Sequence, residues 1–312
     1  MPTSGSVDFS VSRDNILYDA LHIVGAVGPD DTPPTAWVTH AARQLNKVVK
    51  ALGARGPSLW AKKVGYILPV SDTNTVLLGP TGGHATLSYD TALIDVDAVA
   101  TDTTITVDDA SAFSASDYIG VEQDDGTMLW TTVSGAPAGN VITLATALTE
   151  DSSEGRHVYG YTTKLQRPIR VMDAFLHDTD QETDIYIDVV AKLDFDLLGA
   201  KTEVGVVDQF TYEPLLTNGV GYFAPRFEDG SRVLTIIFQR PFEDFDASGD
   251  TPDFPQEWYD FLSLATAVRL APVYGLPVQD RQALRQDAKD ALDLVAGNEP
   301  EEGSLRIVPE VE

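Results

Sequence analysis

The chain has 312 residues, of which 48 are acidic and 21 are basic, so its formal net charge is -27. A hydrophobic fraction of 43% is enough for a packed core and excludes a wholly disordered protein, while the lack of cysteine excludes disulfides, cysteine-based zinc sites and thiol nucleophiles. No apolar run approaches the ~20 residues of a membrane span and the first residues show no signal-peptide pattern, so we expect a soluble, intracellular protein with no membrane partner.

Two helices are predicted in the first 70 residues, which carry seven basic and five acidic side chains and so differ from the strongly acidic remainder. Ser12 is the expected N-cap of the first helix, which can end at Gly25. Thr32 is the expected cap of the second helix, with Pro33 at its first helical position. Apolar residues recur at helical spacing as far as Gly53. The sequence therefore predicts a pair of amphipathic helices in this region.

The second of these helices carries a basic face made of Arg43, Lys47 and Lys50. Side chains three or four positions apart lie on the same side of a helix, so the three charges are neighbours. In a chain this acidic, such a face predicts a contact with an acidic partner. The other interpretation is an ordinary solvated helix face.

The pattern then changes to strands. Extended chain is predicted near residues 63–70 and 75–79, and a separate β module over residues 85–163. The module contains Asp124-Asp125-Gly126, a strong hairpin signal, and its strand spacing is typical of a small barrel or sandwich. The five short strands expected in it are 103–109, 117–123, 127–133, 141–148 and 157–163.

Longer strands are predicted between residues 164 and 250, with a short helix near 191–198, and the chain then returns to helix at Pro255 and Pro277. The expected fold class is α+β: a helical core of about four helices, a β-strand region and an inserted small β-barrel or sandwich. The expected domains are 1–84 for the N-terminal helices and strands of the core, 85–163 for the insertion, 164–296 for the rest of the core and 297–312 for a C-terminal arm.

Within the C-terminal arm, Leu305, Arg306, Ile307 and Val308 alternate like a strand in an otherwise acidic segment. A short strand of this kind can add to the exposed edge of a sheet in another protein. We therefore predict that these four residues bind a partner. The alternative is that the strand packs on its own subunit.

Motifs for catalysis and cofactor binding are missing from the sequence. Its five histidines have neither HExxH spacing nor supporting cysteines, and neither a nucleophile elbow nor a glycine-rich dinucleotide fingerprint is present. We therefore expect no enzyme activity, no cofactor and no metal. Asp244, Asp246 and Asp250 resemble half of a calcium loop, but the bidentate Glu is missing, so a loop that caps its own backbone is the preferred interpretation.

Three stretches carry a resemblance to a known family. They are SRDNILYDALHIVGAVG with TPPTAWVTHAARQLNKVVKALGARGPSLWAKK near the N-terminus, KLQRPIRVMDA, and FQRPFEDFDASGDTPDFPQEWYDFLSLATAVRLAPVYGLP. These stretches look like the head-to-tail adaptor (connector) proteins of short-tailed phages, a class called tail accessory factor, packaged-DNA stabilisation protein or tail tubular protein A. The resemblance covers most of residues 8–296, and the β insertion sets this chain apart from the shortest members. The predicted helical core would then be a helical adaptor core.

Membership of this class implies a structural virion protein. Such proteins form a ring, commonly of twelve copies, under the portal protein at the head–tail junction, and they carry the tail nozzle or tube. The implied partners are the portal protein, the tail nozzle or tube protein and further copies of the chain, while DNA passes through the channel without specific binding. The implied location is the virion tail, and the host cytoplasm during assembly. The basic helix face and the strand in the arm are then expected to contact the portal or a neighbouring subunit.

Two other functions stay open. A tail-associated peptidoglycan hydrolase would need two carboxylates at a defined separation in a cleft. A carbohydrate-binding role of the β insertion would use Trp130, Tyr159 and Tyr161 as an exposed aromatic platform. Because these three residues lie on predicted strands, core packing is the preferred interpretation of them.

Overall fold

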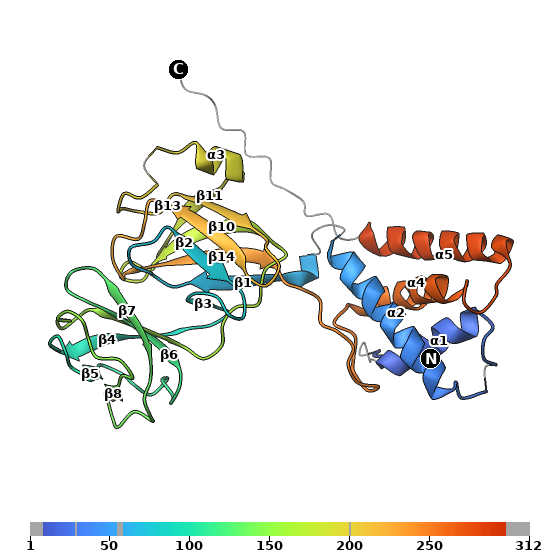
Figure 1. Ribbon diagram of the computed structural model, residues 1–312, viewed down its shortest axis with the longest axis horizontal. Coiled ribbons are helices and arrows are strands. Elements are labelled where there is room, and N and C mark those ends of the chain that lie inside the picture. The colour runs from blue at the N-terminus through green and yellow to red at the C-terminus, as the bar shows by residue number, and fades with distance from the viewer. Residues whose placement is uncertain (1–8, 29, 55–58, 200, 298–312) are drawn as a thin grey trace, which may run out of the picture. The chain divides into compact units, whose positions relative to one another are not determined.

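The computed structural model describes residues 9–28, 30–54, 59–199 and 201–297. The chain packs as two compact units: a helical unit from the residues up to Ala61 and from Pro241 onward, and a β unit from Lys62 to Arg240. Figure 1 shows the chain passing from its first helices into the strands and returning to helices afterwards. The helical unit is therefore made from both ends of the described sequence.

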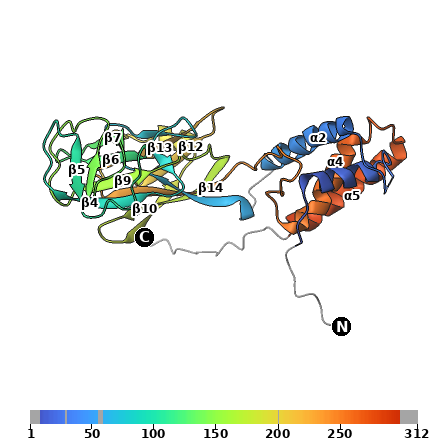
Figure 2. The same ribbon diagram turned by 90° about the horizontal axis from the view of Figure 1, so that it is seen from below.

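The helical unit contains four long helices. Helix α4 lies against the other three, and the first two also pack on each other (Figure 2). Pro277, at which the sequence predicts the return to helix, is the N-cap of the last helix, and Gly297 is its C-cap. The helices are α1 (Arg13–Ile23), α2 (Thr35–Gly53), α4 (Tyr259–Leu270) and α5 (Val278–Ala296), with 3-10 turns at Leu59–Ala61 and Gln256–Trp258.

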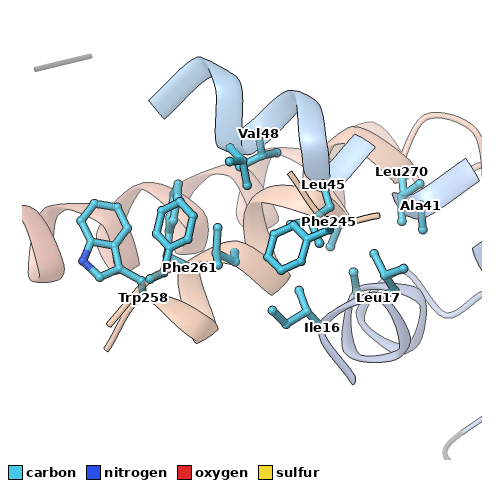
Figure 3. Close-up of a cluster of buried hydrophobic side chains, with 14 of the residues drawn as sticks. Ile16, Leu17, Ala41, Leu45, Val48, Phe245, Trp258, Phe261 and Leu270 are labelled. Carbon is cyan, nitrogen blue, oxygen red and sulfur yellow. The ribbon is translucent and has the colours of Figure 1, made fainter. Parts of the chain in front are cut away.

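The core of the helical unit lies between these helices and the chain that precedes α4. Leu17 of α1 and Leu45 of α2 are fully buried. Trp60 stacks on Phe242 with ring centroids 4.8 Å apart, so aromatic side chains extend the core. Burial of one large apolar side chain contributes about 1.5–3 kcal/mol, which makes this core the main source of the unit's stability. Figure 3 labels nine of the buried side chains: Ile16, Leu17, Ala41, Leu45, Val48, Phe245, Trp258, Phe261 and Leu270.

The N-terminus of α1 is capped as predicted, whereas that of α2 is not. The Ser12 hydroxyl accepts a hydrogen bond from the N–H of Asn15 (3.3 Å), and the Asn15 side chain accepts one from the N–H of Ser12 (3.1 Å). The predicted start of the second helix at Pro33 is wrong. Helix α2 begins at Thr35, with Pro34 as an N-cap that makes no side-chain hydrogen bond. A proline disfavours helical backbone in the residue before it, so Pro34 keeps Pro33 out of the helix.

Replacement of Ser12 by alanine is expected to lower the free energy of unfolding of the helical unit by about 1 kcal/mol, because an N–H of the first turn loses its acceptor. Thr32→Ala is the matched control: Thr32 is exposed and lies before α2 without capping it, so its loss should cost less than about 0.5 kcal/mol. Denaturant unfolding followed by circular dichroism measures both variants. Equal losses in the two would contradict the capping assignment.

The larger sheet of the β unit has eight strands, in the order β2-β13-β12-β11-β10-β14-β1-β3. Its long strand β14 (Arg232–Gln239) pairs antiparallel with β10 and β1. Strands β11 and β12 run parallel, and the connection that a parallel pair requires contains α3 (Lys192–Asp196). The other strands are β1 (Lys62–Ile67), β2 (Thr75–Leu78), β3 (Ala85–Thr86), β10 (Arg170–Asp178), β11 (Thr183–Val189), β12 (Gln209–Glu213) and β13 (Gly219–Ala224).

The smaller sheet of the β unit has six strands, in the order β7-β6-β9-β4-β5-β8. The N–H of Ser134 donates to the carbonyl oxygen of Thr143 (2.7 Å), and the N–H of Ala145 donates to that of Thr132 (2.9 Å). These bonds join the ends of β7 and β8, so the sheet curls nearly into a barrel. Its strands are β4 (Asp90–Val96), β5 (Thr104–Val107), β6 (Tyr118–Glu122), β7 (Met128–Thr132), β8 (Val141–Thr143) and β9 (His157–Tyr161).

The described chain is mostly β, so the predicted fold class, α+β with a helical adaptor core of about four helices, is wrong. Fourteen strands form the two sheets of the described residues, and the four long helices make up only the smaller unit. The physical reason lies in the strand pairing. Strands from either side of the predicted insertion, such as β1 and β14, join one hydrogen-bonded sheet with its own apolar core, and the β unit that contains this sheet is the larger of the two units.

Candidate functional site

The predicted basic face lies on α2, and its three members have different surroundings. Arg43 and Lys47 are exposed, and neither makes an ion pair within the described part of the chain. Lys50 is held by Asp244, with Nζ 2.8 Å from Oδ1, and it donates to the carbonyl oxygen of Phe242 (2.9 Å). Lys50 of α2 therefore binds the segment that precedes α4 within the same unit. Arg43 and Lys47 are the part of the face that can meet a partner.

A hollow of about 590 Å³ opens beside Arg43, between α1 and α2. Arg13 also lines this hollow, but its guanidinium already pairs with Asp14 (2.7 Å) and donates to the carbonyl oxygen of Asp246 (3.2 Å). Helix α2 has no acidic residue along its whole length. The basic character is therefore confined to α2 itself, because Asp14 and Asp246 also line this hollow.

The stretch that resembles half of a calcium loop uses its carboxylates within the helical unit. Asp250 Oδ2 accepts hydrogen bonds from the N–H groups of Ala247 (2.7 Å) and Asp246 (2.8 Å), and these bonds lower the pKa of Asp250. Asp244 pairs with Lys50. Among the residues that the structure describes, no group of three or more His, Asp or Glu is placed to hold a metal ion. The loop therefore caps its own backbone.

The other predicted partner-binding residues, Leu305, Arg306, Ile307 and Val308, lie outside the described residues, and their role as an assembly strand stays a prediction. A strand added by a partner needs a sheet edge. The larger sheet ends in β2 and β3, which are four and two residues long.

No helix in the described part of the chain is long and apolar enough to cross a membrane.

The three aromatic residues considered as a glycan platform are packed inside the β unit. Tyr159 is fully buried and Tyr161 is 2% exposed. The indole N–H of Trp130 donates to the carbonyl oxygen of Pro69 (2.9 Å), and its ring stacks on His84 with centroids 3.8 Å apart. These side chains lie where the two sheets of the β unit meet. They serve as packing between the sheets and form no exposed platform.

A buried ionic cluster, which the sequence does not reveal, joins the same two sheets. Glu122 at the end of β6 is 2% exposed. It accepts hydrogen bonds from the backbone N–H of His157 (3.0 Å), His157 Nδ1 (2.9 Å), the N–H of Gly230 (3.2 Å) and the Arg156 side chain (3.2 Å). His157 Nε2 lies 3.1 Å from Asp180 Oδ1. The imidazole therefore bridges a carboxylate of the smaller sheet and one from the turn after β10.

These carboxylates determine the charge on His157. Burial lowers the pKa of His157, but the hydrogen bond and charge of Glu122, together with Asp180, outweigh burial and raise the pKa above its usual 6.5. Burial raises the pKa of Glu122, but hydrogen bonds from His157 and Gly230 outweigh it and lower the pKa below its usual 4.5. Both shifts favour the ionised forms, a carboxylate at Glu122 and an imidazolium at His157.

The stability of the β unit is expected to fall at alkaline pH because of His157. Its pKa is higher in the folded than in the unfolded state, so its stabilisation is complete below the unfolded value of about 6.5 and is lost as the pH rises through the folded value. Glu122 acts in the opposite sense, since its contribution is lost as the pH falls through its lowered pKa. Denaturant unfolding between about pH 6 and pH 9 measures the alkaline slope. His157→Gln should flatten that slope, and an unchanged slope would contradict the assignment.

Comparisons with known proteins assign no family to this chain. No protein-family model and no curated protein matches it. One match among solved structures is the Gp54 tailspike of Acinetobacter baumannii bacteriophage AP22, solved in complex with A. baumannii capsular saccharide. It is 14% identical, covers 26% of this chain and 16% of the tailspike chain, and has a TM-score of 0.23. A similarity of this size does not establish a common fold.

Proposed function

We propose that this protein is a structural protein of a phage tail and that it acts as a ring-forming adaptor at the head–tail junction. The proposal starts from the sequence resemblance to short-tailed-phage adaptors. The observation that supports it most is where the resembling stretches lie. Those near the N-terminus and those near residues 238–277 are far apart in the sequence, yet most of their residues pack together in the helical unit.

Specific contacts join these stretches. The N–H of Arg13 donates to the carbonyl oxygen of Asp250 (2.7 Å). The Asn46 side chain accepts from the N–H of Phe245 (3.0 Å) and donates to its carbonyl oxygen (3.2 Å). Two of the three resembling stretches thus pack mainly in one folded element, the smaller helical unit, while the third, residues 164–174, belongs to the β unit.

In this proposal the partners are the portal protein, the tail nozzle or tube protein and other copies of the chain. Each copy adds a net charge of -27, and a channel built from such copies repels phosphate. DNA would then slide through the ring without being gripped. The protein would reside in the tail of the virion after assembly in the host cytoplasm.

Electron microscopy and native mass spectrometry of the purified protein test the proposal. The protein is examined alone and mixed with portal rings from the same genome, with portal rings of an unrelated phage as the control. We expect a closed ring, either alone or seated on the matching portal. A protein that stays monomeric and does not bind the matching portal at micromolar concentration would contradict the adaptor role.

Two further assays separate the alternatives. Binding to a glycan array without ring formation would favour a carbohydrate-binding tail protein, and release of soluble fragments from peptidoglycan would favour a hydrolase. A glycan site would have to use residues other than Tyr159 and Tyr161, because both are buried.

A further inference from the structure

The helical unit carries a second surface, an apolar groove of about 420 Å³ between α1 and α4. We call it the α1–α4 groove. Phe9 and Ile23 both line this groove with 66% and 41% of their surface exposed, so they form a small apolar patch. Tyr259 of α4 lies in the same groove and contacts the Phe9 ring, with centroids 6.2 Å apart. The groove is therefore an apolar surface that the described chain leaves open.

Two carboxylates, Asp19 of α1 and Asp260 of α4, line this apolar groove. Burial raises the pKa of Asp19; the charge of His22 opposes this rise, and the charge of Asp260 adds to it. Neither carboxylate makes an ion pair with a residue that the structure describes. The groove thus combines negative charge with apolar walls, and a cation brought in by a partner would relieve the repulsion between the two carboxylates.

Helix α2 presents the complementary surface. Ala36, Arg43, Lys47 and Ala51 follow one another at spacings of seven and four residues, and all four are exposed. They therefore share one side of the helix. The alanines keep this side flat, so another surface can approach closely around the two cations. With no acidic residue on the helix, nothing on α2 itself competes for those cations.

We propose that the α1–α4 groove of one copy binds the Arg43–Lys47 side of α2 of a second copy. Copies with a net charge of -27 repel one another, so they can associate only where opposite charges meet or apolar surface is buried, and this pair of surfaces provides both. The inference rests on the proposed function in one respect, because both require that the chain assembles with itself.

A single copy cannot make this contact with itself. Helix α1 turns Asp14 and Tyr18 toward the hollow beside Arg43, and it turns Asp19 and Ile23 toward the groove. The basic side of α2 and the groove thus lie on different sides of α1. A contact between two different surfaces is heterologous, and repetition of such a contact gives a ring if the rotation closes.

Charge reversal tests the contact. Arg43→Glu with Lys47→Glu in one variant, and Asp19→Lys with Asp260→Lys in another, should each weaken self-association roughly tenfold or more at low salt. An equimolar mixture of the two variants should associate again, because each supplies the surface that the other lacks. Asp287→Lys with Asp293→Lys on the exposed side of α5 is the matched control and should leave association unchanged. Analytical ultracentrifugation measures association in solution, native mass spectrometry measures it on portal rings, and circular dichroism verifies folding.

Cross-linking gives a second, independent readout. Since the chain has no cysteine, copies with Lys47→Cys and copies with Asp260→Cys can be mixed and oxidised without background. We expect a disulfide-linked pair of unlike copies, and much less of it when Gln282→Cys on α5 replaces the second partner. Equal cross-linking in both mixtures, or charge-reversed variants that do not re-associate, would overturn the inference.

The same experiments keep this inference apart from the proposed function. Rings that form normally on the portal with both charge-reversed variants would overturn the contact and leave the adaptor role standing. Failure of the unmodified protein to form any ring or to bind the portal would overturn the adaptor role itself. If the Arg43→Glu, Lys47→Glu variant loses portal binding but self-associates normally, the basic side of α2 serves the portal, and the proposed contact between copies is wrong.

Discussion

Glu122→Ala is expected to lower the free energy of unfolding of the β unit by about 3–5 kcal/mol, because it removes one of the two carboxylates that hold His157 and leaves buried donors without an acceptor. The carboxylate is 2% exposed and accepts four hydrogen bonds. Without it, the backbone N–H groups of His157 and Gly230 lose their acceptor, and the imidazolium keeps only Asp180. The cluster lies where the two sheets meet, so the loss weakens their attachment.

Two variants separate charge from shape in this result. Glu122→Gln keeps the size of the side chain and removes its charge, so it should retain part of the stability. Glu150 is exposed and lies between β8 and β9 of the smaller sheet. Glu150→Ala should therefore change the free energy of unfolding by less than about 0.5 kcal/mol. Denaturant unfolding near neutral pH measures all three variants. A loss below about 1 kcal/mol in Glu122→Ala would mean that the cluster does not hold the sheets together.

Phe261→Ala is expected to destabilise the helical unit by about 3–5 kcal/mol, through lost burial and the cavity left behind. The ring is 6% exposed and packs edge-on against Trp258, with centroids 5.8 Å apart (Figure 3). It belongs to α4, the helix that contacts α1, α2 and α5, so the cavity opens in the core of the helical unit.

The control for this prediction is Leu294→Ala on α5, a residue of similar hydrophobic character that is 73% exposed. Its truncation should cost less than about 0.5 kcal/mol. Calorimetry and helix-sensitive circular dichroism measure both variants. Comparable losses in Phe261→Ala and Leu294→Ala would contradict the position of the core.

Local signals in the sequence give most element boundaries correctly, because the forces behind them act over a few residues. Gly126 adopts a φ of 82° in the turn between β6 and β7, as the Asp-Gly pair predicts. The capping of α1 by Ser12 follows from the same kind of short-range hydrogen bond. Strand β4 is absent from the sequence prediction because it buries only two of its seven side chains and shows little alternation.

The fold class and the buried cluster could not be predicted, because both depend on contacts between distant residues. Lys62 pairs with Gln239 and Ile67 with Leu234, and no local pattern reveals such partners. Glu122 ends a strand as many solvated charges do; only the pairing of β6 with β9 brings it near His157. The position of Arg43 on the exposed face of α2 can be predicted from the spacing of residues alone. The ion pair between Lys50 and Asp244 cannot, because the two residues are far apart in the sequence.

The order in which the chain is synthesised has a consequence for how it folds. Helices α1 and α2 are synthesised before the β unit and pack on each other, but α4 and the chain that precedes it, which complete their core, follow only after residue 240. At about 5–20 residues per second, the β unit alone takes roughly 10–40 s to translate. Throughout this interval α1 and α2 lack α4, while the strands of the β unit can already pair. The helical unit should therefore complete its folding last and depend on chaperones more than the β unit does.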